Sequence, residues 1–186
     1  MRFALFSFAT RKASQPLPHK IPDAMIVYQR QISTRATAND IFRVLSSLGG
    51  KTGWLYANIL WRLRGYFDQL IGGPGLRRGR RISNELSIGD PLDFWRVEAL
   101  VPDQLLRLRA EMKVPGKAWL QFEIIPQNAA RVRIIQTAYY EPNGWTGLLY
   151  WYALYPIHIV IFQGMISAIA HKAVSLSNSR ELTSAS

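Results

Sequence analysis

The segment from Thr146 to Ala170 contains no Asp, Glu, Lys or Arg, and it constrains the fold more than any other feature of the sequence. An uncharged apolar helix of this length must be surrounded either by a lipid bilayer or by the rest of a protein. Pro156, His158 and Gln163 lie near its middle, and its tyrosines and tryptophans are not confined to the two ends. Membrane-spanning helices concentrate these aromatic residues at the ends. The pattern therefore favours a helix enclosed by protein, with membrane association through residues 146–170 as the alternative.

The residues before position 74 predict one strand and two helices. Residues 23–33 are rich in branched and aromatic side chains, which is typical of a strand. Residues 37–50 have helical periodicity, with Thr37 or Asn39 as the candidate N-cap and glycines at the end. Residues 58–73 form a second amphipathic pattern, and its apolar residues on one face are Leu60, Leu63, Phe67, Leu70 and Ile71.

Beyond residue 89 the hydrophobic period changes from about 3.6 to about 2. Residues 90–100, 104–112, 118–125 and 130–140 read as strands, separated by turn signals. Strict alternation of apolar and polar side chains indicates an antiparallel sheet with one buried and one wetted face. The order is one strand, two helices, a run of strands and one long C-terminal helix, which predicts an α+β fold.

The length and composition indicate one globular domain. The chain has 186 residues, 48% of them hydrophobic, which is enough for a single sizeable core. We expect a loose N-terminal arm at residues 1–22, which contains three prolines, a single domain at 23–174 and a polar tail at 175–186. The chain has no cysteine, which excludes disulfides, zinc–thiolate sites and thiol catalysis and is compatible with a reducing cytoplasm.

The net charge of +11 and the pI of about 10.3 suggest an anionic partner, and the densest basic segment is "IGGPGLRRGRRIS" at residues 71–83. Its glycines lack the G-x-G-x-x-G spacing and the strand-to-helix context of a dinucleotide-binding loop. Its arginines would neutralise nucleic-acid phosphates, but no recognition helix or exposed aromatic platform accompanies them. We therefore favour a connector whose arginines reach nearby carboxylates such as Asp68, Asp90 and Asp93. Arg77 and Arg80 are the candidates for binding an anionic ligand head.

The sequence contains no recognisable catalytic motif. Its three histidines do not have metal-ligand spacing, so we expect no metal and no cofactor. His158 is the only titratable group inside the apolar final helix, and it is either a core histidine or a buried acid or base. If alternation places Asp93 and Trp95 on the inner side of a strand, the Asp93 carboxylate needs a partner there.

The element order resembles the START-like (SRPBCC, helix-grip) fold, in which a curved sheet wraps the last helix and encloses a cavity. The segments "GWLYANILWRLRGYFDQLIGG", "GLRRGRR", "GDPLDFWRVEAL", "LRLRAEMKVPGKAWLQFEI" and "LYWYALYPIHIVIFQGM" are also similar to an uncharacterised bacterial domain-of-unknown-function family. That family is often found behind NAD(P)-binding, epimerase-like domains of the short-chain dehydrogenase type. The resemblance implies a fold and not a mechanism. Since this chain has no dinucleotide-binding half, it would act alone or with a separate NAD(P)-binding partner protein.

The combined interpretation is a protein that binds a small apolar or amphipathic molecule in an internal cavity. Trp54 and Trp61 are two helical turns apart, so we expect their indoles to converge with those of Trp95 and Trp151. Polar orientation would come from Asp93, Gln136, His158 and an arginine of the basic loop. The predicted cavity walls are Trp54, Trp61, Trp95, Leu108, Met112, Phe122, Tyr140, Trp151, Tyr155 and Phe162.

Two alternatives from other functional classes stay open. The first is a cyclase-like or hydrolase-like enzyme that uses Asp93 and His158 as polar cavity groups. The second is a membrane-associated or polyanion-binding protein without a cavity.

Overall fold

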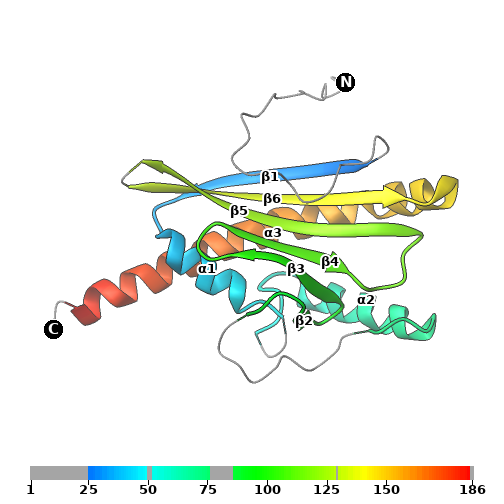
Figure 1. Ribbon diagram of the computed structural model, residues 1–186, viewed down its shortest axis with the longest axis horizontal. Helices are drawn as coiled ribbons and strands as arrows, with labels where there is room; N and C mark the ends of the chain where they lie inside the picture. Colours follow the sequence, from blue (N-terminus) through cyan, green and yellow to red (C-terminus); the bar gives the residue numbers. More distant parts are fainter. Residues whose placement is uncertain (1–24, 50–51, 76–85, 129, 185–186) are drawn as a thin grey trace.

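The computed structural model describes residues 25–49, 52–75, 86–128 and 130–184, with side chains described up to residue 180. Six strands form one antiparallel sheet in the order β1-β6-β5-β4-β3-β2, and a long helix lies across it (Figure 1). This confirms the predicted α+β helix-grip architecture. The elements are β1 (Ile26–Thr34), α1 (Ala38–Ser46), α2 (Asn58–Leu70), β2 (Pro91–Leu92), β3 (Trp95–Val101), β4 (Leu105–Ala110), β5 (Gly116–Asn128), β6 (Arg131–Pro142) and α3 (Gly144–Ser184).

The inner face of the sheet carries the apolar side chains that the alternation predicts. Leu106 and Leu108 of β4 lie opposite Phe122 and Leu120 of β5, and all four side chains are fully buried. Their neighbours in the sequence point to the outer face, where Arg107 donates to the Gln121 side chain at 2.8 Å. The core therefore lies between this inner face and the helices.

The N-cap of helix α1 is Thr37, one of the two predicted candidates. The side chain of Thr37 accepts a hydrogen bond from the Asp40 backbone N–H, and its hydroxyl donates to the Asp40 carboxylate at 2.8 Å. The reciprocal arrangement satisfies donors that have no partner within the first turn of a helix. Ile41, Val44 and Leu45 then face the core from α1.

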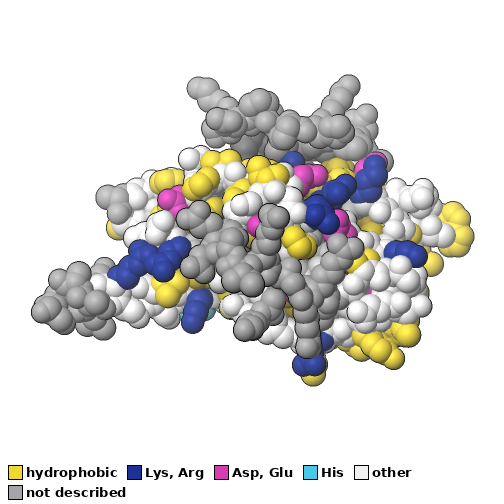
Figure 2. Space-filling model, turned by 60° about the horizontal axis from the view of Figure 1, so that its bottom comes forward, with side chains coloured by type: hydrophobic (Ala, Val, Ile, Leu, Met, Phe, Trp, Pro, Cys, Tyr) yellow, Lys and Arg dark blue, Asp and Glu magenta, His cyan; other side chains and the backbone are white. Residues whose placement is uncertain are grey.

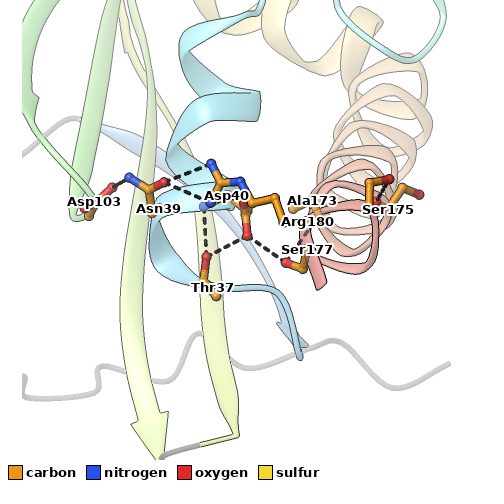
Figure 3. Close-up of polar contacts among 9 residues, drawn as sticks. Thr37, Asn39, Asp40, Asp103, Ala173, Ser175, Ser177 and Arg180 are labelled. Atoms are coloured by element: carbon orange, nitrogen blue, oxygen red, sulfur yellow. Dashed lines mark hydrogen bonds and ion pairs between the residues drawn. The ribbon is translucent and has the colours of Figure 1, made fainter. Parts of the chain in front are cut away.

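The Asp40 carboxylate also fastens α1 to the distant C-terminal part of α3. The Ser177 hydroxyl donates to Asp40 at 2.8 Å, and Arg180 forms an ion pair with it at 2.9 Å (Figure 3). Asp40 is 1% exposed, and a buried carboxylate needs such partners. The helix consequently continues to Ser184, although the sequence suggested a polar tail from residue 175.

Helix α2 turns its apolar face away from the core, which the sequence pattern did not indicate. Its buried residues are Trp61, Gly65 and Asp68. Asp68 accepts hydrogen bonds from the backbone N–H groups of Lys113 at 2.7 Å and Gly75 at 3.0 Å. This buried carboxylate orients the helix, so the predicted apolar face is left outside. Its exposed members are Leu63, Phe67, Leu70 and Ile71.

The two parts of α3 have different surroundings. From Ile161 onward the helix packs against α1 and the sheet and buries Phe162, Met165 and Ile169. Before Ile161 most side chains of α3 are exposed, and Trp145 is 74% exposed. By length and composition α3 could span a membrane, and 33% of its most apolar window is buried in the fold. The expected enclosure of this helix therefore holds from Ile161 onward and not for most of the residues before it.

Candidate functional site

Three of the four tryptophans that were expected to converge form one buried cluster. The Trp54 ring lies 5.3 Å from Trp61 and 6.1 Å from Trp95, measured between centroids. Phe94 completes the group and stacks on Trp54 at 6.2 Å. Trp54 precedes α2 and is not part of it, so the two indoles meet because the chain folds back before Asn58 and not because they share a helix face.

Asp93 belongs to this cluster through its carboxylate. The Trp54 Nε1–H donates to Asp93 Oδ2 at 2.8 Å, and both side chains are buried. Asp93 is not on a strand, because Leu92 pairs with Trp95 and residues 93–94 form the turn between them. Its φ of 55° is the left-handed conformation that Asp tolerates better than most residues. The assumed alternation therefore fails here, and Phe94 is buried together with Asp93 and Trp95.

A second aromatic cluster surrounds His158 on α3. The imidazole lies 5.1 Å from the Trp151 ring and stacks on Phe162 at 5.5 Å. Trp151 in turn stacks on Tyr140 of β6 at 5.3 Å. Trp151 therefore does not join the other three tryptophans but forms the contact between α3 and β6.

The polar atoms of the second cluster are strongly desolvated. Burial lowers the pKa of His158 to about 4, so the imidazole is neutral at neutral pH. Its buried Nδ1 has no hydrogen-bond partner among the described residues. Burial, with Tyr150 as a second cause, raises the pKa of Tyr140 to about 12. The Tyr140 hydroxyl donates to the Pro115 carbonyl at 2.8 Å.

Tyr28 of β1 extends this cluster along the inner face. Its ring lies 5.8 Å from Phe162 and 6.0 Å from Tyr155. Arg30, two residues further along the same face, donates from Nε to the Tyr28 hydroxyl at 2.7 Å. A guanidinium is thus present on the inner side of the sheet.

Between the two aromatic clusters the inner face carries small side chains. Trp95 of β3 pairs with Ala110 of β4, and Tyr140 of β6 pairs with Ala118 of β5. Ala110 follows Arg109, the last β4 residue paired with β5, so it lies beside Ala118. Both alanines are only partly buried. The row from Trp95 to Tyr140 therefore carries large side chains at its two ends and small side chains, Ala110 and Ala118, in its middle.

The next rows of the inner face combine apolar walls with one amide. Leu120 pairs with Ala138, and Phe122 pairs with Gln136. Gln136 also pairs with Arg30 of β1. The Gln136 side chain is buried, and its Oε1 has no hydrogen-bond partner among the described residues. Buried polar atoms are nearly always paired in folded proteins, so this amide is a candidate for contact with a ligand.

The remaining predicted site residues have different surroundings. The Nε1 atoms of Trp61 and Trp95 are buried donors without a partner in the described part of the chain. Leu108 is fully buried, while Met112 packs against the core at the end of β4. Arg77 and Arg80 lie outside the described residues. Within the described ranges no group of three His, Asp or Glu side chains could hold a metal ion.

Asp93 and His158, the two polar groups of the enzyme alternative, lie in different aromatic clusters. Asp93 lies with Trp54 in the first cluster, and His158 lies between Trp151 and Phe162 in the second. Sequence reasoning missed Phe94, Tyr28 and Arg30 as members of these clusters. Only the positions of these residues in the sequence could have indicated their role. Phe94 follows a turn residue, and Tyr28 and Arg30 lie on the same face of β1.

The sequence model of a family described as "Protein of unknown function (DUF2867)" matches residues 21–165. No curated protein matches the sequence. Among solved structures, a point mutant of norcoclaurine synthase from Thalictrum flavum, in complex with a transition-state analogue, is similar with a TM-score of 0.53. The identity is 12%, and the alignment covers 85% of this chain and 99% of that one.

Two di-domain ARO/CYC proteins are also similar in structure. BexL has a TM-score of 0.50 at 16% identity over 82% of this chain and 48% of its own. StfQ, from the steffimycin biosynthetic pathway, has a TM-score of 0.50 at 11% identity over 84% and 53%. This chain thus spans about half the length of these two-domain proteins. At such identities the likeness shows the fold alone.

Proposed function

This chain belongs to DUF2867, a family of unknown function, and has the helix-grip fold; from these premises we propose that it binds a small apolar or amphipathic molecule between the sheet and α3. The ligand would lie on the inner face between the first cluster (Trp54, Trp61, Phe94 and Trp95) and the second (Tyr140, Trp151, His158 and Phe162). A separate NAD(P)-binding partner protein stays a prediction from the family resemblance.

The observation that carries the proposal is the row of small side chains between Trp95 and Tyr140. Ala110 and Ala118 occupy its middle and are only partly buried, although they lie on the inner face of the sheet. The row crosses three interstrand spacings, which amount to about 14 Å. That length supports a ligand of several fused rings or an extended chain rather than a small ion.

The unpartnered polar atoms support an amphipathic ligand rather than a pure hydrocarbon. The Trp95 Nε1–H is a buried donor at one end of the row. Gln136 Oε1 on β6 and His158 Nδ1 on α3 are also buried. They could form hydrogen bonds with hydroxyl or carbonyl groups of a ligand. A ligand with oxygen atoms on an apolar frame would satisfy these atoms, which solvent cannot easily reach.

The test is a titration with a fluorescent fatty acid and with polycyclic aromatic probes while tryptophan emission is recorded. We expect saturable quenching with one-to-one stoichiometry. Ala118→Phe fills the row and should abolish quenching while the protein stays folded. If Ala118→Phe fails to fold, Ala110→Leu provides the same test at the neighbouring position. Unaltered probe affinity in both variants, or no saturable quenching by any probe, would overturn the proposal.

The second candidate function is an enzyme of the cyclase or hydrolase type. The observation that favours it is His158, a neutral imidazole whose Nδ1 has no partner in the described part of the structure. Such a group can exchange a proton with a bound molecule. His158→Phe should then abolish turnover of a bound substrate and leave its affinity nearly unchanged. Loss of affinity without any turnover in the wild type would instead support simple binding.

A further inference from the structure

One end of the molecule exposes large apolar side chains from two helices. On α2 and at its C-cap these are Phe67, Leu70 and Ile71, with Leu70 63% exposed. On the first turns of α3 they are Trp145, Leu148, Leu149 and Tyr152. We call these seven residues the end surface. Isolated exposed apolar residues are common, whereas two groups of large apolar side chains at one end of the molecule favour a contact site.

The connection between β4 and β5 brings the two helices to the same end. Lys113 in this connection donates from its backbone to Asp68 and from Nζ to the Ile71 carbonyl at 3.0 Å, so it holds the end of α2. Pro115, two residues later, accepts from the Asn143 backbone N–H at 2.9 Å, immediately before α3 begins. The end of α2 and the start of α3 therefore flank one short loop (Figure 1).

The space-filling view agrees with this arrangement. Figure 2 shows hydrophobic side chains gathered at the right-hand end of the molecule, at its outer tip and along its lower edge. Dark blue basic side chains lie between these two groups. The end surface is thus apolar with basic residues beside it.

The charges at this end are of a kind that an anionic surface attracts. Arg62 is exposed on α2 and Lys113 is exposed in the β4–β5 connection, while the exposed Lys117 is paired with Glu141 at 3.4 Å. The only acidic residue of α2, Asp68, is fully buried. From Gly144 to Arg180 helix α3 contains no acidic residue at all. Basic residues near an anionic lipid surface are attracted to it.

We propose that the end surface docks on an anionic lipid bilayer, with α2 and the start of α3 inserted at the level of the headgroups. Trp and Tyr are the residues preferred at that level, and Trp145 and Tyr152 are among the most exposed side chains of the surface. The protein lies on the membrane and does not cross it, because the C-terminal half of α3 is packed in the core.

A second copy of the chain is the competing occupant, and charge argues against it. Each copy carries a net charge of +11, so two copies that approach through a basic end repel one another. A bilayer with anionic lipids attracts the same end. The proposal uses none of the inner-face residues, so it stands or falls separately from the proposed ligand binding.

The test is flotation of the full chain with vesicles of phosphatidylcholine alone and of phosphatidylcholine mixed with phosphatidylglycerol. We expect binding to the mixed vesicles, weak binding to the neutral ones and release by high salt. Phosphatidylglycerol with brominated acyl chains should quench the emission of Trp145. Trp145→Phe should bind equally well and lose this quenching, which places the residue at the bilayer.

Two double variants and one matched control test the surface itself. Phe67→Gln with Leu70→Gln, and Leu148→Gln with Leu149→Gln, should each lower the partition coefficient by about tenfold or more. The control is Val27→Gln with Val101→Gln, which changes two exposed apolar side chains (39% and 40%) outside the end surface. It should bind as the wild type does.

Three results would overturn the proposal. The first is no binding of the wild type to the mixed vesicles. The second is an equal loss of binding in the Val27→Gln, Val101→Gln control, because the surface would then have no special role. The third is a dimeric wild type that both double variants convert to monomers, without vesicle binding by either form. That result would identify a second copy as the occupant.

Discussion

The indole Nε1 of Trp54 donates a hydrogen bond of 2.8 Å to the carboxylate of Asp93, and both residues are buried. Asp93 is in a left-handed turn conformation between β2 and β3, so the bond ties the segment before α2 to the sheet edge. Trp61, which touches the Trp54 ring, is buried with its own Nε1 unpartnered among the described residues.

This contrast predicts unequal effects of removing the two indole donors. Trp54→Phe should lower the free energy of unfolding by about 1–3 kcal/mol beyond its loss of packing, because the buried carboxylate loses a donor. Trp61→Phe is the matched control, since it removes an indole without breaking a hydrogen bond to any residue that the structure describes. Urea denaturation of both variants measures the difference. Equal losses would mean that the Trp54–Asp93 bond contributes nothing measurable.

The burial of Phe162 predicts a large effect for its removal. Phe162 is 6% exposed and contacts Tyr28 and His158, so Phe162→Ala should destabilise the fold by about 3–5 kcal/mol through cavity formation. Val160 lies two residues earlier on the same helix and is 54% exposed. Val160→Ala should change the stability by about 0.5 kcal/mol or less. Thermal unfolding compares the two variants, and similar small shifts in both would contradict the packing of α3 in the core.

The lowered pKa of His158 predicts that the fold weakens in mild acid. Between pH 6.5, the ordinary value, and pH about 4 the unfolded chain binds a proton that the folded chain does not. The contribution of the neutral His158 to the free energy of unfolding is therefore fully present above about pH 6.5. It is lost progressively as the pH falls toward 4. Between about pH 7.5 and pH 5 the loss should be about 2 kcal/mol. His158→Phe removes the titrating group, so urea denaturation should show about this much less dependence on pH. An unchanged pH dependence in the variant would exclude His158 as the source.

The Asp40 contacts predict that the last turns of α3 stabilise the domain. Ser177→Ala with Arg180→Gln removes two partners of a carboxylate that is 1% exposed, and the stability should fall by about 1–3 kcal/mol. Lys172→Gln is the control, because Lys172 is an exposed basic residue on the same helix. Urea denaturation again provides the measurement. A loss no larger than that of Lys172→Gln would show that this part of α3 contributes little.

The sequence by itself determined the elements and the inner face of the sheet. A strand with period-2 alternation can bury only one of its two faces, so Leu106, Leu108, Leu120 and Phe122 had to face inward together. The N-cap was also predictable to one of two residues, Thr37 or Asn39, because a capping side chain acts on a residue about three positions away. These features depend on local geometry, and local geometry follows from neighbouring residues.

The tertiary structure decided which elements meet and which apolar residues stay outside. The amphipathic pattern of α2 indicates a face but not its direction, and the buried Asp68 carboxylate, held by the distant Lys113 backbone, turns that face outward. The tertiary structure also decided the partner of Trp151, which contacts Tyr140 because α3 crosses β6 at that point. The helix extends past residue 175 because Asp40, far away in sequence, binds Ser177 and Arg180. Buried carboxylates and stacked rings take partners from any part of the chain, so their contacts follow from the path of the backbone and not from the local pattern of residues.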